Sequence, residues 1–262
     1  MSLVAWARST PQIFRAERAD RVPATLADVT DAARHLVSLS FDDGFRASSI
    51  RTAEIFERRG LAASFNVIAT GHHADFSSPD AYQDAIEKGD FGLWRDLAER
   101  GHEIMPHGYR HANKGELPFA EARDLVERCL EVFAAELPAF RAEEAVLGLP
   151  YNAASDELAA WLPSVVRAYR VGGDGINDMP DATLVRLSST VFGPRNGNEA
   201  HFFAKIDELT ARESGWLVYL LHGLGEEGYG PVSEDFLEEM LDALCEIDSV
   251  DLVTPARALA RA

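Results

Sequence analysis

From about residue 35 onward the chain alternates short apolar runs with amphipathic segments. The first run, residues 35–41, reads His-Leu-Val-Ser-Leu-Ser-Phe, a pattern typical of a strand buried on both faces of a parallel sheet. Residues 48–59 carry apolar side chains at helical spacing, with Gly60 just past their end, and residues 62–69 form a second apolar run. This order predicts a βαβ unit, whose crossover connection requires parallel strands.

The same alternation continues to the end of the chain. It predicts helices over 91–100, 118–137, 155–162, 199–212, 233–247 and 255–260, and strands over 102–106, 145–150, 165–171, 184–187, 216–221 and 250–253. Seven or eight βα units without a linker predict an α/β fold: a single-domain, distorted (β/α)7-8 barrel over residues 35–262. Residues 1–34 are interpreted as an N-terminal extension, helical near 26–34.

Residues 70–90 interrupt this alternation. The segment is polar and rich in Gly, Asp and Ser, and it is interpreted as an inserted loop. Long loops in a compact domain usually carry function. His72, His73 and Asp75 within it suit a metal site, but a solvated loop is the favoured interpretation.

The net charge of the chain limits the classes of molecule that it is expected to bind. The 262 residues include 43 acidic and 25 basic side chains, a net charge of −18. Such an excess disfavours binding to nucleic-acid phosphates or to anionic membranes. No window is long and apolar enough to span a bilayer, and the first residues lack the pattern of a signal peptide, so we expect a cytoplasmic protein. Cys129 and Cys245 lie in predicted helices, where buried thiols are expected rather than a disulfide.

Two adjacent carboxylates, Asp42 and Asp43, end the first predicted strand and are followed by Gly44. Side chains alternate along a strand, so one carboxylate can bind a metal while the other moves a proton. The carboxyl ends of parallel strands are where α/β folds place their chemistry. The pair also suits an ordinary turn, because Asp is a common turn residue.

Histidines follow two further predicted strands. His107 and His111 come after the strand at 102–106, and their spacing puts both rings on one side if the turn is helical. Two imidazoles and a carboxylate suit zinc and also non-haem iron(II). His222 follows the strand at 216–221, as either a core residue or a general acid at the mouth of the barrel.

Three segments together resemble the polysaccharide deacetylase family, the NodB-homology or carbohydrate esterase family 4 domain. They read Ser-Phe-Asp-Asp-Gly at 40–44, His-Gly-Tyr-Arg-His at 107–111 and Leu-Leu-His at 220–222. The resemblance covers about residues 35–260 and implies a distorted barrel, one divalent metal (Zn²⁺, with Co²⁺ or Ni²⁺ as alternatives) and hydrolysis of an N-acetyl or related amide on a sugar.

The resemblance also implies a role for each matching residue. Asp42 would be the catalytic base and His222 the catalytic acid. The metal ligands would be Asp43, His107 and His111. Substrate would be bound by Pro150 and Tyr151, with the Tyr151 backbone N–H as oxyanion donor, and by Asp174 in a faint echo of the fourth motif.

The third motif departs from the family pattern. Gly148 stands where the family has an Arg that pairs with the base carboxylate. Loss of that cation would favour the protonated form of Asp42. Arg110, Arg170 or Arg195 are the candidates to replace it.

Rival functions follow from this divergence. One is an amidohydrolase of a non-sugar cyclic amide or ureide, which the missing Arg favours. Another is a metal-binding or carbohydrate-binding member that has lost turnover, which the presence of Asp42 and His222 disfavours. An iron(II) oxygenase shares the ligand types, but the predicted barrel topology does not suit it.

Overall fold

One nine-stranded sheet organises the part of the chain that the structure, a computed structural model, describes: residues 34–193 and 197–262. The strands are β1 (His35–Phe41), β2 (Ser64–Val67), β3 (Glu103–Pro106), β4 (Val146–Gly148), β5 (Ala168–Gly172), β6 (Ile176–Asn177), β7 (Arg186–Val191), β8 (Gly215–Leu221) and β9 (Val250–Leu252). Their order is β3-β2-β1-β8-β7-β5-β4, with β6 on β8 and β9 on β1. Only the β6–β8 pairing is antiparallel among these strands.

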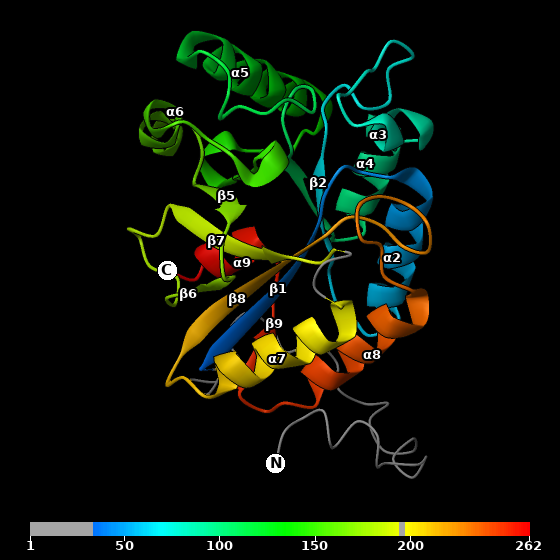
Figure 1. Cartoon of the computed structure of the whole chain (residues 1–262), viewed down its shortest axis with the longest axis vertical. Helices are drawn as coiled ribbons and strands as arrows, with labels where there is room; N and C mark the ends of the chain where they lie inside the picture. The colour runs from blue at the N-terminus through cyan, green and yellow to red at the C-terminus, as the bar shows by residue number, and fades with distance from the viewer. Residues whose placement is uncertain (1–33, 194–196) are drawn as a thin grey trace.

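Helices cover the outside of this sheet (Figure 1). They are α2 (Arg46–Glu57), α3 (Ala81–Ala85), α4 (Phe91–Glu99), α5 (Phe119–Glu136), α6 (Asp156–Trp161), α7 (Asn198–Thr210), α8 (Glu234–Cys245) and α9 (Pro255–Leu259), with 3-10 turns at Ala142–Glu144, Pro150–Asn152 and Leu162–Ser164. Ser155 and Ser233 cap α6 and α8 by accepting hydrogen bonds from Leu158 and Phe236.

Strand β1 lies inside the sheet, between β2 and β8, and all seven of its residues are buried. It pairs with β8 over its whole length, from His35 opposite Gly215 to Phe41 opposite Leu221. Strand β9 pairs with its beginning and β2 with its end. The carboxyl end of β1 is therefore flanked by those of β2 and β8 at one edge of the sheet.

The ends of the sheet, β3 and β4, almost close it into a barrel. They form no strand pairing with each other, but the Val146 amide donates to Met105 Sδ at 3.4 Å and His107 Nδ1 lies 3.1 Å from the Gly148 carbonyl oxygen. The structure thus confirms the predicted distorted (β/α) barrel.

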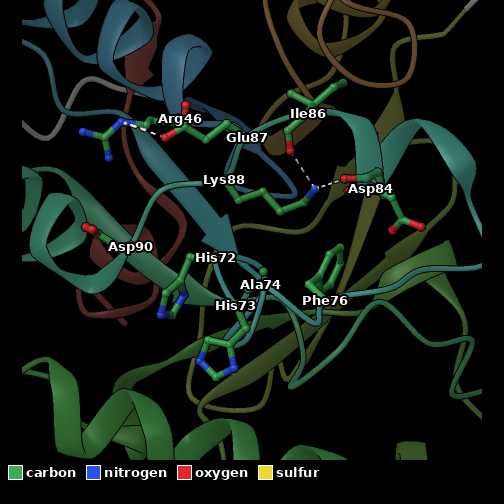
Figure 2. A pocket seen from close by; sticks show the side chains of 12 residues that line it. Arg46, His72, His73, Ala74, Phe76, Asp84, Ile86, Glu87, Lys88 and Asp90 are labelled. Carbon is green, nitrogen blue, oxygen red and sulfur yellow. Dashed lines mark hydrogen bonds and ion pairs between the residues drawn. The ribbon is translucent and has the colours of Figure 1, made fainter.

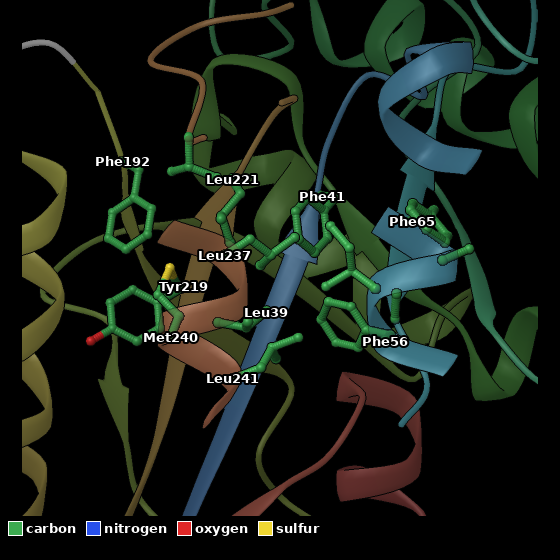
Figure 3. Packing of buried hydrophobic residues seen from close by; sticks show 14 of the residues in the cluster. Leu39, Phe41, Phe56, Phe65, Phe192, Tyr219, Leu221, Leu237, Met240 and Leu241 are labelled. Carbon is green, nitrogen blue, oxygen red and sulfur yellow. The ribbon is translucent and has the colours of Figure 1, made fainter. Parts of the chain in front are cut away.

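A large aromatic and aliphatic cluster fixes the end of β1 (Figure 3). The Phe41 ring packs edge-on against Phe56 of α2 and tilted against Phe65 of β2, each with ring centroids 6.0 Å apart. Met240 and Leu241 of α8 are fully buried in the same cluster. Because Phe41 immediately precedes Asp42, this packing fixes the backbone from which the site begins.

Several features differ from the sequence prediction, among them the helix α3 within the segment expected to be a loop. The short strand β6 was not predicted, and two residues are too few to give a periodic signal. The expectation that both cysteines are buried is wrong for Cys245, which is exposed, whereas Cys129 is buried. Leu244 is the residue that faces the core at the end of α8, so its neighbour faces outward.

The predicted N-terminal extension, apart from residue 34, lies outside the described residues. Within the described part of the chain, no helix combines the length and the apolar character needed to cross a membrane.

Candidate active site

Three strand ends bring the predicted chemical groups to one edge of the barrel. Asp42 and Asp43 follow β1, His107 follows β3, and His222 follows β8. The Asp42 amide donates to the Leu221 carbonyl at 2.9 Å, so the first carboxylate leaves its strand beside the residue that precedes His222. Parallel pairing is what lets residues so distant in sequence converge.

The turn after β1 has an unusual backbone. Asp43 has φ of 74° and Gly44 has φ of 71°, both in the left-handed region. A non-glycine residue there is uncommon and is held by its surroundings, often at functional sites. A Cβ at position 44 would also lie 3.0 Å from the Trp94 ring, so glycine suits this position on two grounds.

Asp43, His107 and His111 form a buried group whose ligand atoms lie within 4.8 Å of one another. Each histidine places Nε2 3.5 Å from Asp43 Oδ1. Among the described residues, neither Asp43 oxygen accepts a hydrogen bond, although both are buried. A buried carboxylate without donors, facing two imidazole nitrogens, fits a divalent cation as third partner.

The pKa shifts of Asp43 and His111 are also those expected of metal ligands. Burial by itself would raise the pKa of Asp43, but contact with His107 and the charges of His222, His107 and His111 outweigh it and hold this pKa well below its ordinary value. Burial lowers the pKa of His111 to about 4. At neutral pH, therefore, the carboxylate is ionised and the His111 ring keeps a free lone pair, as metal ligands must.

Asp42 is held by a different set of partners. Arg170 of β5 donates through Nη2 to both Asp42 oxygens, at 2.5 and 2.6 Å, and Asn66 Nδ2 donates to Oδ1 at 3.0 Å. The Arg170 and Asp42 side chains are 1% and 2% exposed, so the pair is shielded from water. Charge-assisted contacts of this length fix the carboxylate in one orientation.

The structure explains the glycine in the third motif. A Cβ at position 148 would lie 2.8 Å from Arg170 Nη2 and 3.0 Å from His107 Nδ1. Glycine on β4 thus leaves room for a guanidinium from the neighbouring strand β5. Of the other candidates, Arg110 pairs with Glu121 at the surface, and Arg195 lies outside the described residues.

Tyr151 lies beside His111. Its φ is 59°, and its ring centroid is 4.8 Å from that of His111. Pro150 before it is buried. Asp174, by contrast, is exposed in the turn before β6, where it accepts hydrogen bonds from the Ile176 amide and the Ser188 hydroxyl.

His222 faces the two carboxylates from β8. Burial lowers its pKa, and the charges of Asp43 and Asp42 oppose that shift. Its Nδ1 is buried without a hydrogen-bond partner in the described part of the chain. The loop after it is tied to α2, since Ser48 donates from its amide to Glu227 and accepts through Oγ from the Leu224 amide at 2.8 Å.

The 70–90 segment is joined to the turn after β1 and lines most of a cavity of about 370 Å³ (Figure 2). The Gly89 amide donates to the Gly44 carbonyl at 3.0 Å. Lys88 donates to the Gln83 and Ile86 carbonyls. His72 and His73 line the cavity, but among the described residues they belong to no group of three potential metal ligands.

One residue of the site, Asn66, was missed from sequence. A polar residue within a predicted buried strand does carry a signal, because polar groups are rarely buried without partners, but its partner could not be read from the chain. Arg170, charged within another predicted strand, was one of three candidates to pair with Asp42, and it is the one that does so in the structure.

Comparison with known proteins agrees with the motifs. The family model described as "Polysaccharide deacetylase" matches residues 30–161, about half of the chain. No curated protein matches the chain in sequence.

Solved structures share the fold at low sequence identity. The Xyl-CE4 domain of a multidomain xylanase from the hindgut metagenome of Trinervitermes trinervoides is 14% identical, with a TM-score of 0.57 over 86% of this chain and 90% of that one. A family 4 acetyl xylan esterase from Clostridium thermocellum, in complex with a cobalt ion, is 16% identical, with a TM-score of 0.56 over 86% and 91%. Puue allantoinase is 11% identical, with a TM-score of 0.62 over 92% and 97%.

Proposed function

The chain belongs to the polysaccharide deacetylase family, and from that premise we propose that it is a metal-dependent hydrolase that removes N-acetyl or related amide groups from a sugar or oligosaccharide. The observation that carries the proposal is the pairing of two differently held carboxylates. Asp43 faces His107 and His111 and accepts no hydrogen bond from any described residue, while Asp42 beside it is fixed by Arg170. One is arranged to bind a cation and the other to accept a proton.

Asp43, His107 and His111 would hold one divalent ion, for which we propose Zn²⁺; Co²⁺ and Ni²⁺ suit the same ligands. Such an ion polarises a bound carbonyl and acidifies a water molecule. His107 Nδ1 is 3.1 Å from the Gly148 carbonyl oxygen, so its proton resides there and Nε2 remains available as a ligand.

Asp42 would remove the proton from the attacking water. Because Arg170 and Asn66 fix its carboxylate, it needs little reorganisation to act as general base. The backbone N–H of Tyr151 would hold the developing oxyanion. His222 would then protonate the leaving amine; burial lowers its pKa, and the charges of Asp43 and Asp42 oppose that shift.

A cyclic amide or ureide is the alternative substrate class. The argument for it was the missing arginine of the third motif, and Arg170 now fills that role from β5. A member without turnover is the other alternative, but a binding protein has no need of the Asp42–Arg170 pair or of His222.

The test combines metal analysis with turnover of purified protein. We expect about one zinc per chain, lost in His107→Ala and His111→Ala, and acetate release from a panel of N-acetylated sugars. Asp42→Asn should keep the metal and lower turnover about 10²–10⁴-fold. His222→Ala should slow amides far more than esters with good leaving groups, because only the amine needs the acid.

Several outcomes would contradict the proposal. Wild-type turnover in Asp42→Asn would remove the base, and equal losses on amides and esters in His222→Ala would remove the acid. Hydrolysis of a cyclic ureide without action on N-acetylated sugars would establish the alternative substrate class.

A further inference from the structure

We infer that Asp80, in the inserted 70–90 segment, is a positioning residue for the metal ligand His111, and that Tyr151 holds Asp80 in place. The inference rests on the proposed function for the role of His111. It adds a residue outside the five that the family motifs supplied as base, acid and metal ligands.

The contacts lie on the side of His111 that faces away from Asp43. Asp80 Oδ2 is 3.3 Å from His111 Nδ1 and accepts a hydrogen bond from the Tyr151 hydroxyl at 2.6 Å. Ser78 Oγ is 3.5 Å from the same ring nitrogen and accepts from the Asp80 amide at 3.2 Å. The Nε2 atom of His111 thus faces Asp43, and its Nδ1 atom faces two oxygen atoms of the insertion, those of Asp80 and Ser78.

These contacts would fix the tautomer of His111. An imidazole that binds a metal through Nε2 must carry its proton on Nδ1, and an acceptor at Nδ1 keeps it there. A carboxylate acceptor also makes the ring a stronger ligand. His107 obtains its acceptor from the barrel itself, the Gly148 carbonyl, whereas His111 depends on the insertion.

The insertion is built to hold Asp80 at this place. Asp80 directly precedes α3, and the Ser78 amide donates to Asp84 Oδ1 at 2.8 Å. The far end of the segment pairs with the turn after β1 through a bridge between Lys88 and Phe45. The insertion therefore contacts both the carboxylate and the histidine sides of the site.

Tyr151 connects Asp80 and His111 to the part of the site where the substrate would bind. Its ring lies 4.8 Å from the His111 ring, and its hydroxyl reaches Asp80 while its backbone is the proposed oxyanion donor. One hydrogen bond thus links the orientation of a metal ligand to the loop that would contact the reacting carbonyl.

The experiment measures zinc affinity of the metal-free full-length protein by competition with a chromophoric chelator, which requires no substrate. Asp80→Ala should weaken zinc binding about 10- to 100-fold. Asp80→Asn, which keeps an acceptor oxygen, should lose less, and Tyr151→Phe should fall between wild type and Asp80→Ala. Asp75→Ala is the matched control, because it removes the same charge from an exposed residue of the same segment.

Two results would overturn the inference: wild-type zinc affinity in Asp80→Ala, or an equal loss in Asp75→Ala. Equal losses in Asp80→Ala and Asp80→Asn would also do so, since the acceptor would then not matter. Thermal melting of the metal-free variants establishes that they fold alike. Tight zinc binding without amide hydrolysis by wild type would overturn the proposed function alone, whereas absence of zinc binding by wild type would overturn both.

Discussion

At the scale of single residues, the most informative feature is the way that Gly148 leaves room for Arg170. A guanidinium from β5 contacts Asp42, and the missing side chain on β4 makes the space for it. The two positions face each other directly across neighbouring strands, since Gly148 is the register partner of Arg170. An arginine at 148 and one at 170 would compete for the same volume, so each residue accounts for the other.

This pairing predicts the effect of Arg170→Met. Removal of one partner of a buried ion pair leaves an uncompensated charge, which typically costs about 3–5 kcal/mol of unfolding free energy. The double variant Arg170→Met/Asp42→Asn should recover much of that loss, because the buried carboxylate is gone. Urea unfolding of the four proteins gives the coupling directly. Additive effects would show that Asp42 and Arg170 are not energetically coupled.

Lys114 is another buried cation besides Arg170, and the proposed mechanism does not use it. It is fully buried, its Nζ has no hydrogen-bond partner among the described residues, and burial lowers its pKa to about 8. The unfolded chain holds this proton up to about pH 10.5, so the contribution of Lys114 to stability should become less unfavourable as pH rises from about 8 to 10.5. Lys114 therefore destabilises the fold at neutral pH.

Lys114→Met should accordingly raise the unfolding free energy at pH 7 by about 3 kcal/mol, from a pKa difference of roughly 2.5 units. The gain over wild type should shrink towards zero as pH approaches 10.5. Burial raises the pKa of the neighbouring Cys129 thiol to about 12 and the charge of Lys114 opposes that shift, so the contribution of the thiol cancels in the difference only below about pH 9, where it is protonated in both the folded and the unfolded protein. Denaturant unfolding at pH 7, 9 and 10 tests this, and a pH-independent difference would contradict it.

At the scale of elements, the sequence predicted what depends on local pattern. Apolar runs identified β1 and β8, and parallel crossovers implied that Asp42, His107 and His222 meet at one edge. Strand order could not be read, because it depends on which faces pack together rather than on periodicity. The same limit hid Asp80, an acid in a polar segment that only its neighbours distinguish from Asp75.

At the scale of the whole molecule, the described residues form a barrel with one unpaired seam. The strands β3 and β4 meet there without backbone pairing, and His107 crosses to the Gly148 carbonyl. The candidate metal site joins the end of β1 to the residues after β3, next to this seam. A bound ion would therefore tie the end of β1 to the segment that follows β3.

Zinc should consequently stabilise the whole fold. At a free concentration 100 times the dissociation constant, binding contributes about 2.7 kcal/mol, which corresponds to a rise in melting temperature of roughly 5–10 °C for a chain of this size. Asp43→Asn should still fold, because asparagine tolerates the left-handed backbone at this position, and it should lose the response to zinc because the carboxylate ligand is gone. Calorimetry of both proteins with zinc and with a chelator measures these effects, and an equal zinc-dependent shift in Asp43→Asn would place the ion elsewhere.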